Sequence, residues 1–358
     1  MDKILTIVIP TYNMEKYLTK CLDSLIVSED NMHVLEVLIV NDGSKDKSSE
    51  IGRSYVMKYP DTFRVIDKEN GNYGSCVNRG LLEAKGKYIK ILDADDNFKN
   101  ENFDNYVSFL KTTDVDMVVS DYDIVDEKGS IIKSVSFELP QEGTTSLNSL
   151  TTEDSPYIWH QAVAYKTENL RRIGYKQTEG ISYTDEEWVF KPMVTVHKLS
   201  YFPHTIYLYL RGREGQTYDP IVFRKTFKNI YTVTRSVTDY YSKWKDKVAD
   251  EGIKRFLYER IHLKLLILYR FYLIKESNNE GNQLISAFDK NLKDICPSVY
   301  DSFGSRPFEL GFHYIQEWRE KGYDRKAIKL VIFRILYKTA VGLRLLLNKL
   351  HIIKVNQI

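Results

Sequence analysis

Short apolar runs alternate with amphipathic segments along the first 120 residues of the chain. The runs are rich in β-branched residues, and each ends at a polar or turn-forming residue, which is typical of buried strands. The segments between them carry apolar residues at spacings of three and four, as one face of a helix does. We predict strands at Leu5–Pro10, Leu35–Val40, Phe63–Asp67, Tyr88–Leu92 and Asp116–Ser120.

Capping residues and glycines delimit the helices between these strands. We predict a helix from Met14 to about Leu25, a second from a Ser44 or Asp46 cap to about Tyr59, and a third from a turn at Gly71–Gly74 to about Ala84. Strand–helix alternation at this spacing implies right-handed crossovers. The fold class is therefore α/β, with a mostly parallel sheet flanked by helices on both faces.

The pattern changes in the second half of the chain. Tyr122–Val125 and Ile131–Leu139 flank a turn, and they predict an antiparallel excursion, after which helical character returns. From about Phe223 onward the segments are long, aromatic-rich and helical, and residues 253–275 have the character of a bundle core. A polar, glycine-containing stretch at Gly212–Pro220 predicts a boundary between an α/β domain (1–215) and a helical domain (216–358).

Composition narrows the class of protein. The chain has 358 residues, with 51 Lys and Arg against 49 Asp and Glu, and a net charge of +2, which argues against a nucleic-acid-binding surface. Its three cysteines have no zinc-site spacing. The short apolar run near the N-terminus does not have the form of a secretion signal, and no long apolar run predicts a spanning helix. We expect a cytoplasmic protein.

Polar residues follow three of the predicted strands, at the sheet edge where ligands bind in open α/β folds. Tyr12 follows the first strand and can stack on a nucleobase, whereas Asp42 follows the second and can accept a base N–H. Asp93, Asp95 and Asp96 follow the fourth strand. Carboxylates so close repel one another, which favours a bound divalent cation. Each feature alone also fits an ordinary loop or turn cap.

Five motifs together resemble the inverting family 2 glycosyltransferases of the GT-A fold. They are TIVIPTYN, VLIVNDGSKDKS, N-G-N-x-G-x-x-x-N-R-G from Asn70 to Gly80, GKYIKILDADD and YTDEEW, in this order. The resemblance covers roughly residues 3–215. It implies a UDP-sugar donor, Mn²⁺ or Mg²⁺, and a hydroxyl acceptor on a glycan, a lipid-linked glycan or a glycoprotein. It also implies a role in the synthesis of cell-surface polysaccharide, teichoic acid or glycoconjugates.

The resemblance implies a donor site built from the motif residues. Asp95 would ligate the metal that bridges the diphosphate. One position departs from the pattern: many relatives have an arginine where Val77 stands, and Arg79 follows two residues later, so the group that holds the donor there is left open. The implied donor-binding set is Pro10, Thr11, Tyr12, Asn13, Asp42, Asn70, Asn78, Asp93, Ala94 and Asp95.

Inversion needs a carboxylate that takes the proton from the attacking hydroxyl. The family motif is usually Glu-Asp with the Asp as base, and here the pair reads Thr184-Asp185. Asp185 is therefore the predicted catalytic base, with Glu186 as its rival. The alternative is an ordinary helix N-terminus, with Thr184 as cap and acidic residues in the first turn.

Two further features resemble bacterial members of the family. His160 matches a histidine near the acceptor side, although a buried packing histidine fits equally well. Arg211 and Arg213 belong to a polar loop that could close over the diphosphate. A plain surface loop is the alternative.

The C-terminal segment 325–358 contains no Asp or Glu and carries eight basic residues among Leu, Ile and Val. This basic amphipathic pattern favours peripheral contact with an anionic membrane, and the alternatives are packing on the protein or a contact in a homo-oligomer.

Two other functions compete with sugar transfer. A catalytically silent sugar-nucleotide-binding or scaffold protein would be expected to lack Asp95 or Asp185. A nucleotidyltransferase would want a glycine-rich loop with Arg and Lys after the first strand, where Thr11-Tyr12-Asn13-Met14 stands.

Overall fold

The computed structural model describes residues 2–150, 157–213, 216, 220–275, 278–305 and 313–349. The chain divides into two compact units between Leu257 and Tyr258. The predicted boundary at 212–220 stays a prediction, and α8 (Pro220–Trp244) belongs to the first unit. Glu214 and Gly215 of the predicted loop, and the basic segment from residue 350 onward, lie outside the described residues.

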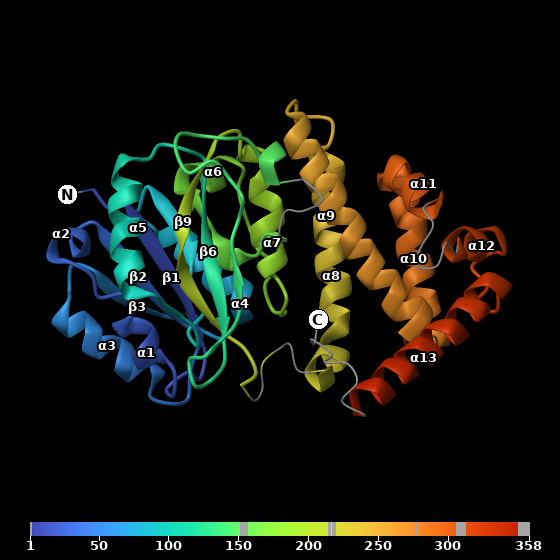
Figure 1. Ribbon diagram of the computed structural model, residues 1–358, viewed down its shortest axis with the longest axis horizontal. Helices are drawn as coiled ribbons and strands as arrows, with labels where there is room; N and C mark the ends of the chain where they lie inside the picture. The colour runs from blue at the N-terminus through green and yellow to red at the C-terminus, as the bar shows by residue number, and fades with distance from the viewer. Residues whose placement is uncertain are drawn as a thin grey trace. The chain divides into compact units, whose positions relative to one another are not determined.

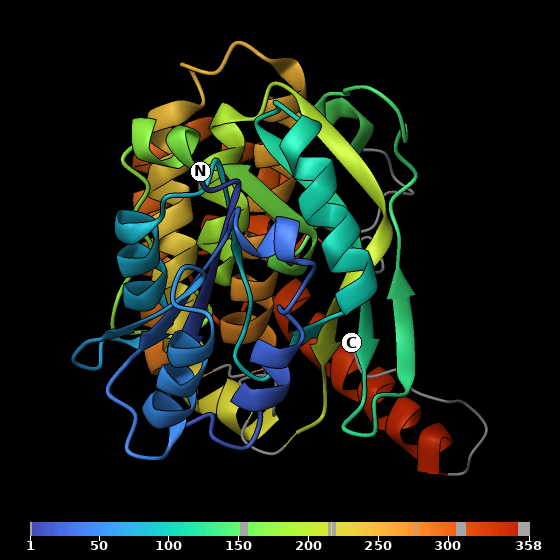
Figure 2. The ribbon, with the colours of Figure 1, turned by 90° about the vertical axis from the view of Figure 1, so that its left-hand side faces the viewer.

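Within the described residues, nine strands of the first unit form one sheet in the order β3-β2-β1-β4-β8-β6-β9-β5, with β7 paired to β6. Strands β1, β2, β3, β6 and β9 are labelled in Figure 1, and Figure 2 shows the ribbon turned by 90°. The pairs β3–β2, β2–β1, β1–β4 and β6–β9 are parallel, and the others are antiparallel. The predicted, mostly parallel α/β architecture is confirmed. The strands are β1 (Leu5–Thr11), β2 (Leu35–Asn41), β3 (Phe63–Asp67), β4 (Tyr88–Ile91), β5 (Asn97–Phe98), β6 (Met117–Val125), β7 (Ile131–Val135), β8 (Val163–Lys166) and β9 (Leu199–Leu210).

Helices cover both faces of the sheet because neighbouring strand residues point to opposite sides. An added Cβ at Gly80 of α4 would lie 2.4 Å from Val8, so this helix packs tightly on one face. On the other face, an added Cβ at Gly52 of α3 would lie 2.9 Å from Val65 and 3.3 Å from Ile39. The helices of the first unit are α1 (Leu18–Asp23), α2 (Glu29–Met32), α3 (Ser48–Lys58), α4 (Asn72–Glu83), α5 (Asn100–Thr112), α6 (Thr167–Arg172), α7 (Asp185–Phe190) and α8, with 3₁₀ turns η1 (Leu147–Leu150), η2 (His160–Ala162) and η3 (Lys191–Thr195).

The first helix is shorter than predicted, beginning at Leu18 rather than Met14 and ending at Asp23. Asn13 has a left-handed backbone (φ 54°), and the backbone N–H groups of residues 13–15 donate to the side chains of Ser44, Ser48 and Asp46. The N-cap of α3 is Lys47 rather than Ser44 or Asp46; Asp46 lies one residue earlier and accepts the Ser48 backbone N–H at 3.0 Å.

The second half of the sheet differs from the sequence prediction. The segments Asp116–Ser120 and Tyr122–Val125 form one continuous strand, β6, and the return strand β7 ends at Val135 rather than Leu139. Strands β8 and β9 were not predicted. Pro203 made β9 hard to predict, because proline interrupts a strand pattern. In the structure the register of β6 and β9 shifts between Ser120 and Asp121, and this irregularity accommodates the proline.

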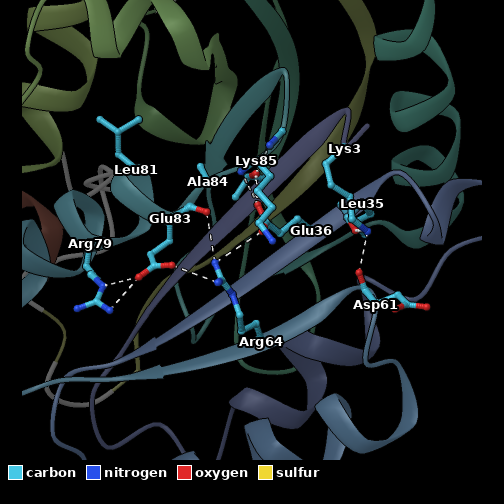
Figure 3. A network of polar contacts seen from close by, with 12 residues as sticks. Lys3, Leu35, Glu36, Asp61, Arg64, Arg79, Leu81, Glu83, Ala84 and Lys85 are labelled. Carbon is cyan, nitrogen blue, oxygen red and sulfur yellow. Dashed lines mark hydrogen bonds and ion pairs between the residues drawn. The ribbon is translucent and has the colours of Figure 1, made fainter. Parts of the chain in front are cut away.

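A polar network closes the edge of the sheet at the amino ends of the parallel strands (Figure 3). Lys3 donates to the carbonyls of Leu35 and Asp61 at 2.8 and 2.7 Å. The Glu36 carboxylate, which is buried, accepts from the Thr6 hydroxyl at 2.7 Å and lies 3.7 Å from Arg64. This end is therefore filled by its own contacts, which leaves the carboxyl ends of the strands for a ligand.

The second unit is helical, as predicted. It contains the end of α9 (Glu251–Arg270), a π-helical turn η4 (Phe271–Lys275), α10 (Asn279–Ile295), α11 (Pro297–Ser305), α12 (Tyr314–Glu320) and α13 (Ile328–Lys349). Its interior holds an ion pair in which Arg319 donates to the fully buried Asp289 at 2.6 Å. Most apolar residues of 253–275 are buried, which fits the expected bundle core. No described helix is long and apolar enough to cross a bilayer.

Candidate active site

The ends of β1 and β2 are joined where the nucleobase site was predicted. The Asp42 N–H donates to the Thr11 carbonyl at 2.8 Å, and the Asn13 side chain accepts from the Lys45 N–H at 2.8 Å. Thr11 is buried, whereas Tyr12 is 47% exposed. Pro10, half-buried at the end of β1, completes this edge. An exposed ring beside a fixed turn offers a surface on which a base can stack.

The Asp42 carboxylate is buried and already has partners. It accepts from the Lys68 ammonium at 2.6 Å and from the N–H groups of Gly71 and Asn72, both at 2.9 Å. Asn70 donates to the Asp42 carbonyl at 3.0 Å. Two carboxylate oxygens offer about four acceptor positions, so a base N–H could still bind. The predicted role of Asp42 stays a prediction.

The three aspartates that follow β4 have separate partners. Asp96 is fully buried and accepts from the Tyr207 hydroxyl at 2.6 Å and the Leu210 N–H at 2.7 Å; burial and the charge of Asp95 raise its pKa. Asp95 pairs with Arg213, whose Nε lies 2.5 Å from its carboxylate. Asp96 thus links the segment after β4 to β9, and the roles predicted for Asp93 and Asp95 stay predictions.

Asp93 lies at the centre of a charged cluster drawn from separate segments. Its carboxylate accepts from the Tyr73 hydroxyl at 2.9 Å and lies 3.2 Å from His160 Nε2. Burial opposes the ionisation of Asp93, but the charge and hydrogen bond of His160, the hydrogen bond of Tyr73 and the charge of Arg213 together lower its pKa. Burial likewise disfavours the His160 cation, but the charges of Asp93 and Asp185 raise the pKa of that imidazole. His160 therefore stands within the electrostatic reach of both carboxylates.

The rival base candidates differ in environment. Asp185 is the first residue of α7, behind Tyr183 in a left-handed conformation (φ 66°). It is half-buried, whereas Glu186 is 3% exposed and Glu187 is fully buried. Burial raises the pKa of Tyr73 most, followed by the charge of Asp93 and then by that of Asp185. Asp185 thus lies near the Asp93 cluster. Its role as base stays a prediction.

The helix N-terminus proposed as the alternative is present, but Thr184 does not cap it through its side chain. Its hydroxyl instead accepts from Gln177 at 3.0 Å. Glu187 accepts from Thr178 N–H at 2.6 Å and from Lys191 at 2.8 Å. The third acid of the motif is therefore structural, and it anchors α7 so that Asp185 is held in place.

Arg213 and Arg211 follow β9. The Arg213 guanidinium lies 5.4 Å from the Tyr17 ring centre, besides its contact with Asp95. The Arg211 N–H donates to the Val125 carbonyl at 2.9 Å. Arg213 is thus beside the predicted metal ligand, in a position from which a guanidinium can reach a phosphate.

Asp95 is the residue to which the sequence assigned a divalent cation, and that role stays a prediction. Burial and the charge of Asp93 raise the pKa of Asp95, and the positive charge of Arg213 partly opposes them. Among the described residues no three His, Cys, Asp or Glu side chains gather as a metal site. Mg²⁺ sites of this kind use one or two carboxylates, with substrate phosphates and water completing the shell.

Asn78 lies on α4 but contacts another segment. It donates to the Gln177 carbonyl at 2.9 Å and to Glu179 at 2.8 Å, and it accepts from the Gln177 N–H at 2.8 Å. Val77 is fully buried and Arg79 pairs with Glu83 at 2.8 Å (Figure 3), so neither replaces the arginine of the family pattern. Asn78 therefore holds the segment around Gln177–Glu179, which precedes α7.

Sequence reasoning missed three residues of the cluster's surroundings. Tyr73 lies within the Asn70–Gly80 motif at a variable position, and Lys68 follows β3. Lys90 on β4 is fully buried and donates to the carbonyls of Gln161 and Val163 at 2.6 and 3.2 Å, which flank the turn carrying His160. A lysine inside a strand pattern was the available signal. Ala94, which is also buried, separates Asp93 from Asp95.

Residues 6–174 match the model of Glycosyl transferase family 2. The chain carries a family 2 glycosyltransferase domain. The match includes the ends of β1, β2 and β4 and His160, and it stops short of Asp185.

Similar proteins extend the match beyond this domain. GlyG of Streptococcus pneumoniae is 24% identical over 306 residues, which cover 83% of this chain and 95% of that protein. The minor teichoic acid biosynthesis protein GgaB of Bacillus subtilis is 37% identical over 105 residues, which cover 29% of this chain and 12% of that much longer protein. Residues 1–349 of S. aureus TarS, solved in complex with UDP-GlcNAc, share the fold with a TM-score of 0.67 and 18% identity, over 92% of this chain and 91% of that one. The fold is thus of the GT-A type with a helical C-terminal region.

Proposed function

We propose that this protein is an inverting glycosyltransferase that moves a sugar from a UDP-sugar to a hydroxyl group of a cell-surface glycan, such as a teichoic acid or another polysaccharide. The observation that carries the proposal is that Asp93 lies 3.2 Å from His160, an imidazole whose pKa is raised against burial by the charge of Asp93 and also by that of Asp185. The family domain supports the reaction class. The UDP-GlcNAc complex of TarS supports the donor class, and the name of GgaB supports the acceptor class.

Asp185 acts as the general base in this proposal. It accepts the acceptor proton as the hydroxyl oxygen attacks the anomeric carbon, and a positioned base of this kind contributes roughly 10²–10⁴-fold. Burial lowers the pKa of His160, but the charges of Asp93 and Asp185 raise it. The protonated imidazole reduces the repulsion between these two carboxylates. Asp93 contacts the ribose or the donor sugar, and Tyr73 holds it in orientation.

The diphosphate lies near Asp95 and Arg213. Asp95 would hold Mn²⁺ or Mg²⁺, which supplies positive charge to the departing diphosphate. Arg213 must then release at least part of its contact with Asp95, and its guanidinium becomes available to the phosphate oxygens.

The proposal can be tested by measuring the hydrolysis of UDP-GlcNAc and other UDP-sugars in the presence of Mn²⁺. Water replaces the acceptor in this reaction, because a general base also activates water, and the rate of UDP release is measured. Asp185→Asn should lower the release rate by about 10²-fold or more while UDP binding, measured by calorimetry, stays unchanged. Glu186→Gln is the matched control, since it alters the neighbouring acid, and it should keep release.

Two outcomes would contradict the proposal. If Glu186→Gln loses release while Asp185→Asn keeps it, and circular dichroism shows both variants folded, Glu186 is the base. If the wild-type protein binds UDP but releases it from no UDP-sugar, with or without polysaccharide acceptors, the protein is a sugar-nucleotide-binding protein rather than a transferase.

A further inference from the structure

Helix α13 exposes a stripe of large apolar side chains. Ile328 is 69% exposed, Ile332 42%, Ile335 60% and Leu336 39%, and their spacing of three and four residues places them on one side of the helix. The opposite side packs into the second unit through buried residues, namely Ala327, Leu330 and Phe333. We call the four exposed residues the α13 stripe. Other exposed large apolar residues in the first unit, such as Met57 and Leu82, lie on other helices.

The charges beside the stripe have one sign. Lys329 and Lys338 are exposed and, by the helical repeat, flank it on its two sides. Arg334 turns inward, where it donates to the carbonyls of Leu273 and Arg325 at 2.6 and 2.7 Å. No acidic residue occurs from 325 to the end of the sequence. Two acidic residues lie at the start of the helix, where Asp324 accepts the Lys326 backbone N–H and Glu317 accepts that of Lys329.

We propose that the α13 stripe docks on the surface of an anionic lipid bilayer, with the helix lying in the plane of the membrane. An apolar face flanked by lysines matches such a surface, because the side chains enter the acyl boundary while the ammonium groups contact anionic headgroups. A second copy fits less well, because two identical faces would bring their lysine flanks together. The proposal goes beyond the transferase function and does not depend on it.

The test is flotation of the full chain with vesicles of equal parts phosphatidylglycerol and phosphatidylcholine, against vesicles of phosphatidylcholine alone. The wild-type protein should float with the anionic vesicles, and high salt should weaken binding. The Ile332→Glu/Ile335→Glu variant should bind at least about tenfold more weakly. The affinity of Lys329→Glu/Lys338→Glu for the anionic vesicles should fall by about fivefold or more for each lysine replaced.

Met57→Glu/Leu82→Glu is the matched control, because it also places two acids at exposed apolar positions. It should bind anionic vesicles like the wild type. UDP release without vesicles reports separately on the transferase function, and the stripe variants should leave it unchanged.

Several results would overturn the proposal. One is absence of wild-type binding to the anionic vesicles, and another is equal binding by Ile332→Glu/Ile335→Glu. If that variant instead converts a dimer into a monomer, as measured by light scattering, the stripe is a contact between copies. If it lowers the melting temperature of a protein that does not bind vesicles, the stripe packs within the chain.

Discussion

Lys90 allows a quantitative prediction of how stability depends on pH. Its ammonium is fully buried and donates to two neutral carbonyls, those of Gln161 and Val163. Burial lowers the pKa of Lys90 from the usual 10.5 to about 7, because removal from water disfavours the charged form. We predict that Lys90→Met, which keeps the length of the side chain and removes its charge, changes the pH dependence of the free energy of unfolding.

The magnitude follows from the two pKa values. The difference between 10.5 and about 7 means that burying the protonated form costs about 5 kcal/mol at pH values well below 7. Between pH 7 and 10.5 the unfolded chain binds the proton more often than the folded chain, so stability rises with pH. Integration from pH 7 to 9 gives a gain of about 2 kcal/mol for the wild-type protein. In Lys90→Met this contribution disappears.

Urea denaturation at pH 7, 8 and 9, followed by tryptophan fluorescence, measures the effect. Trp188 is buried in the first unit and reports its unfolding. Across this range the free energy of unfolding of the wild type should rise by about 2 kcal/mol more than that of Lys90→Met, and the effects of groups that do not interact with Lys90 cancel in the difference. Lys85→Met is the control, because Lys85 is exposed, and it should follow the wild type. Parallel curves for the wild type and Lys90→Met would refute the reasoning.

Three further predictions concern the metal, the sheet and the second unit. Asp95→Asn should abolish Mn²⁺-dependent UDP binding in calorimetry, because it removes the anionic ligand; undiminished Mn²⁺-dependent binding would contradict the metal assignment. Gly80→Ala should destabilise the protein by about 1–3 kcal/mol, since its Cβ would lie 2.4 Å from Val8; in chemical denaturation Val8→Ala should relieve part of this loss, and simple additivity would argue against the clash. Arg319→Met should cost about 3–5 kcal/mol by leaving Asp289 buried without its cation; a thermal melt unchanged from the wild type would show that the pair contributes little.

The sequence alone determined the parallel half of the sheet and the edge at which the site lies. Strands β1 to β4 follow the predicted ranges closely. The inner strands β1, β2 and β4 are almost entirely buried and mainly apolar, whereas β3 lies at the edge of the sheet and is partly exposed. The polar residues that end them also emerge at one edge, because parallel strands share a direction. Asp42 and Thr11 are therefore neighbours in the structure as the sequence predicted.

Only the tertiary structure decided the strands that complete the sheet. Strand β9 carries Pro203, and its pairing depends on an irregular register with β6, a long-range feature that local pattern does not contain. Likewise, the turn at residues 13–15 before α1 is held by hydrogen bonds to Ser44, Asp46 and Ser48, which are long-range contacts that local pattern does not contain.

The roles of the acidic residues were likewise decided by folding. Sequence spacing grouped Asp93, Asp95 and Asp96, but the chain turns Asp96 to Tyr207, Asp95 to Arg213 and Asp93 to His160. Those partners come from segments more than sixty residues away. A carboxylate's charge state depends on burial and on neighbours at a few ångströms, and these are properties of the packed chain rather than of the local sequence.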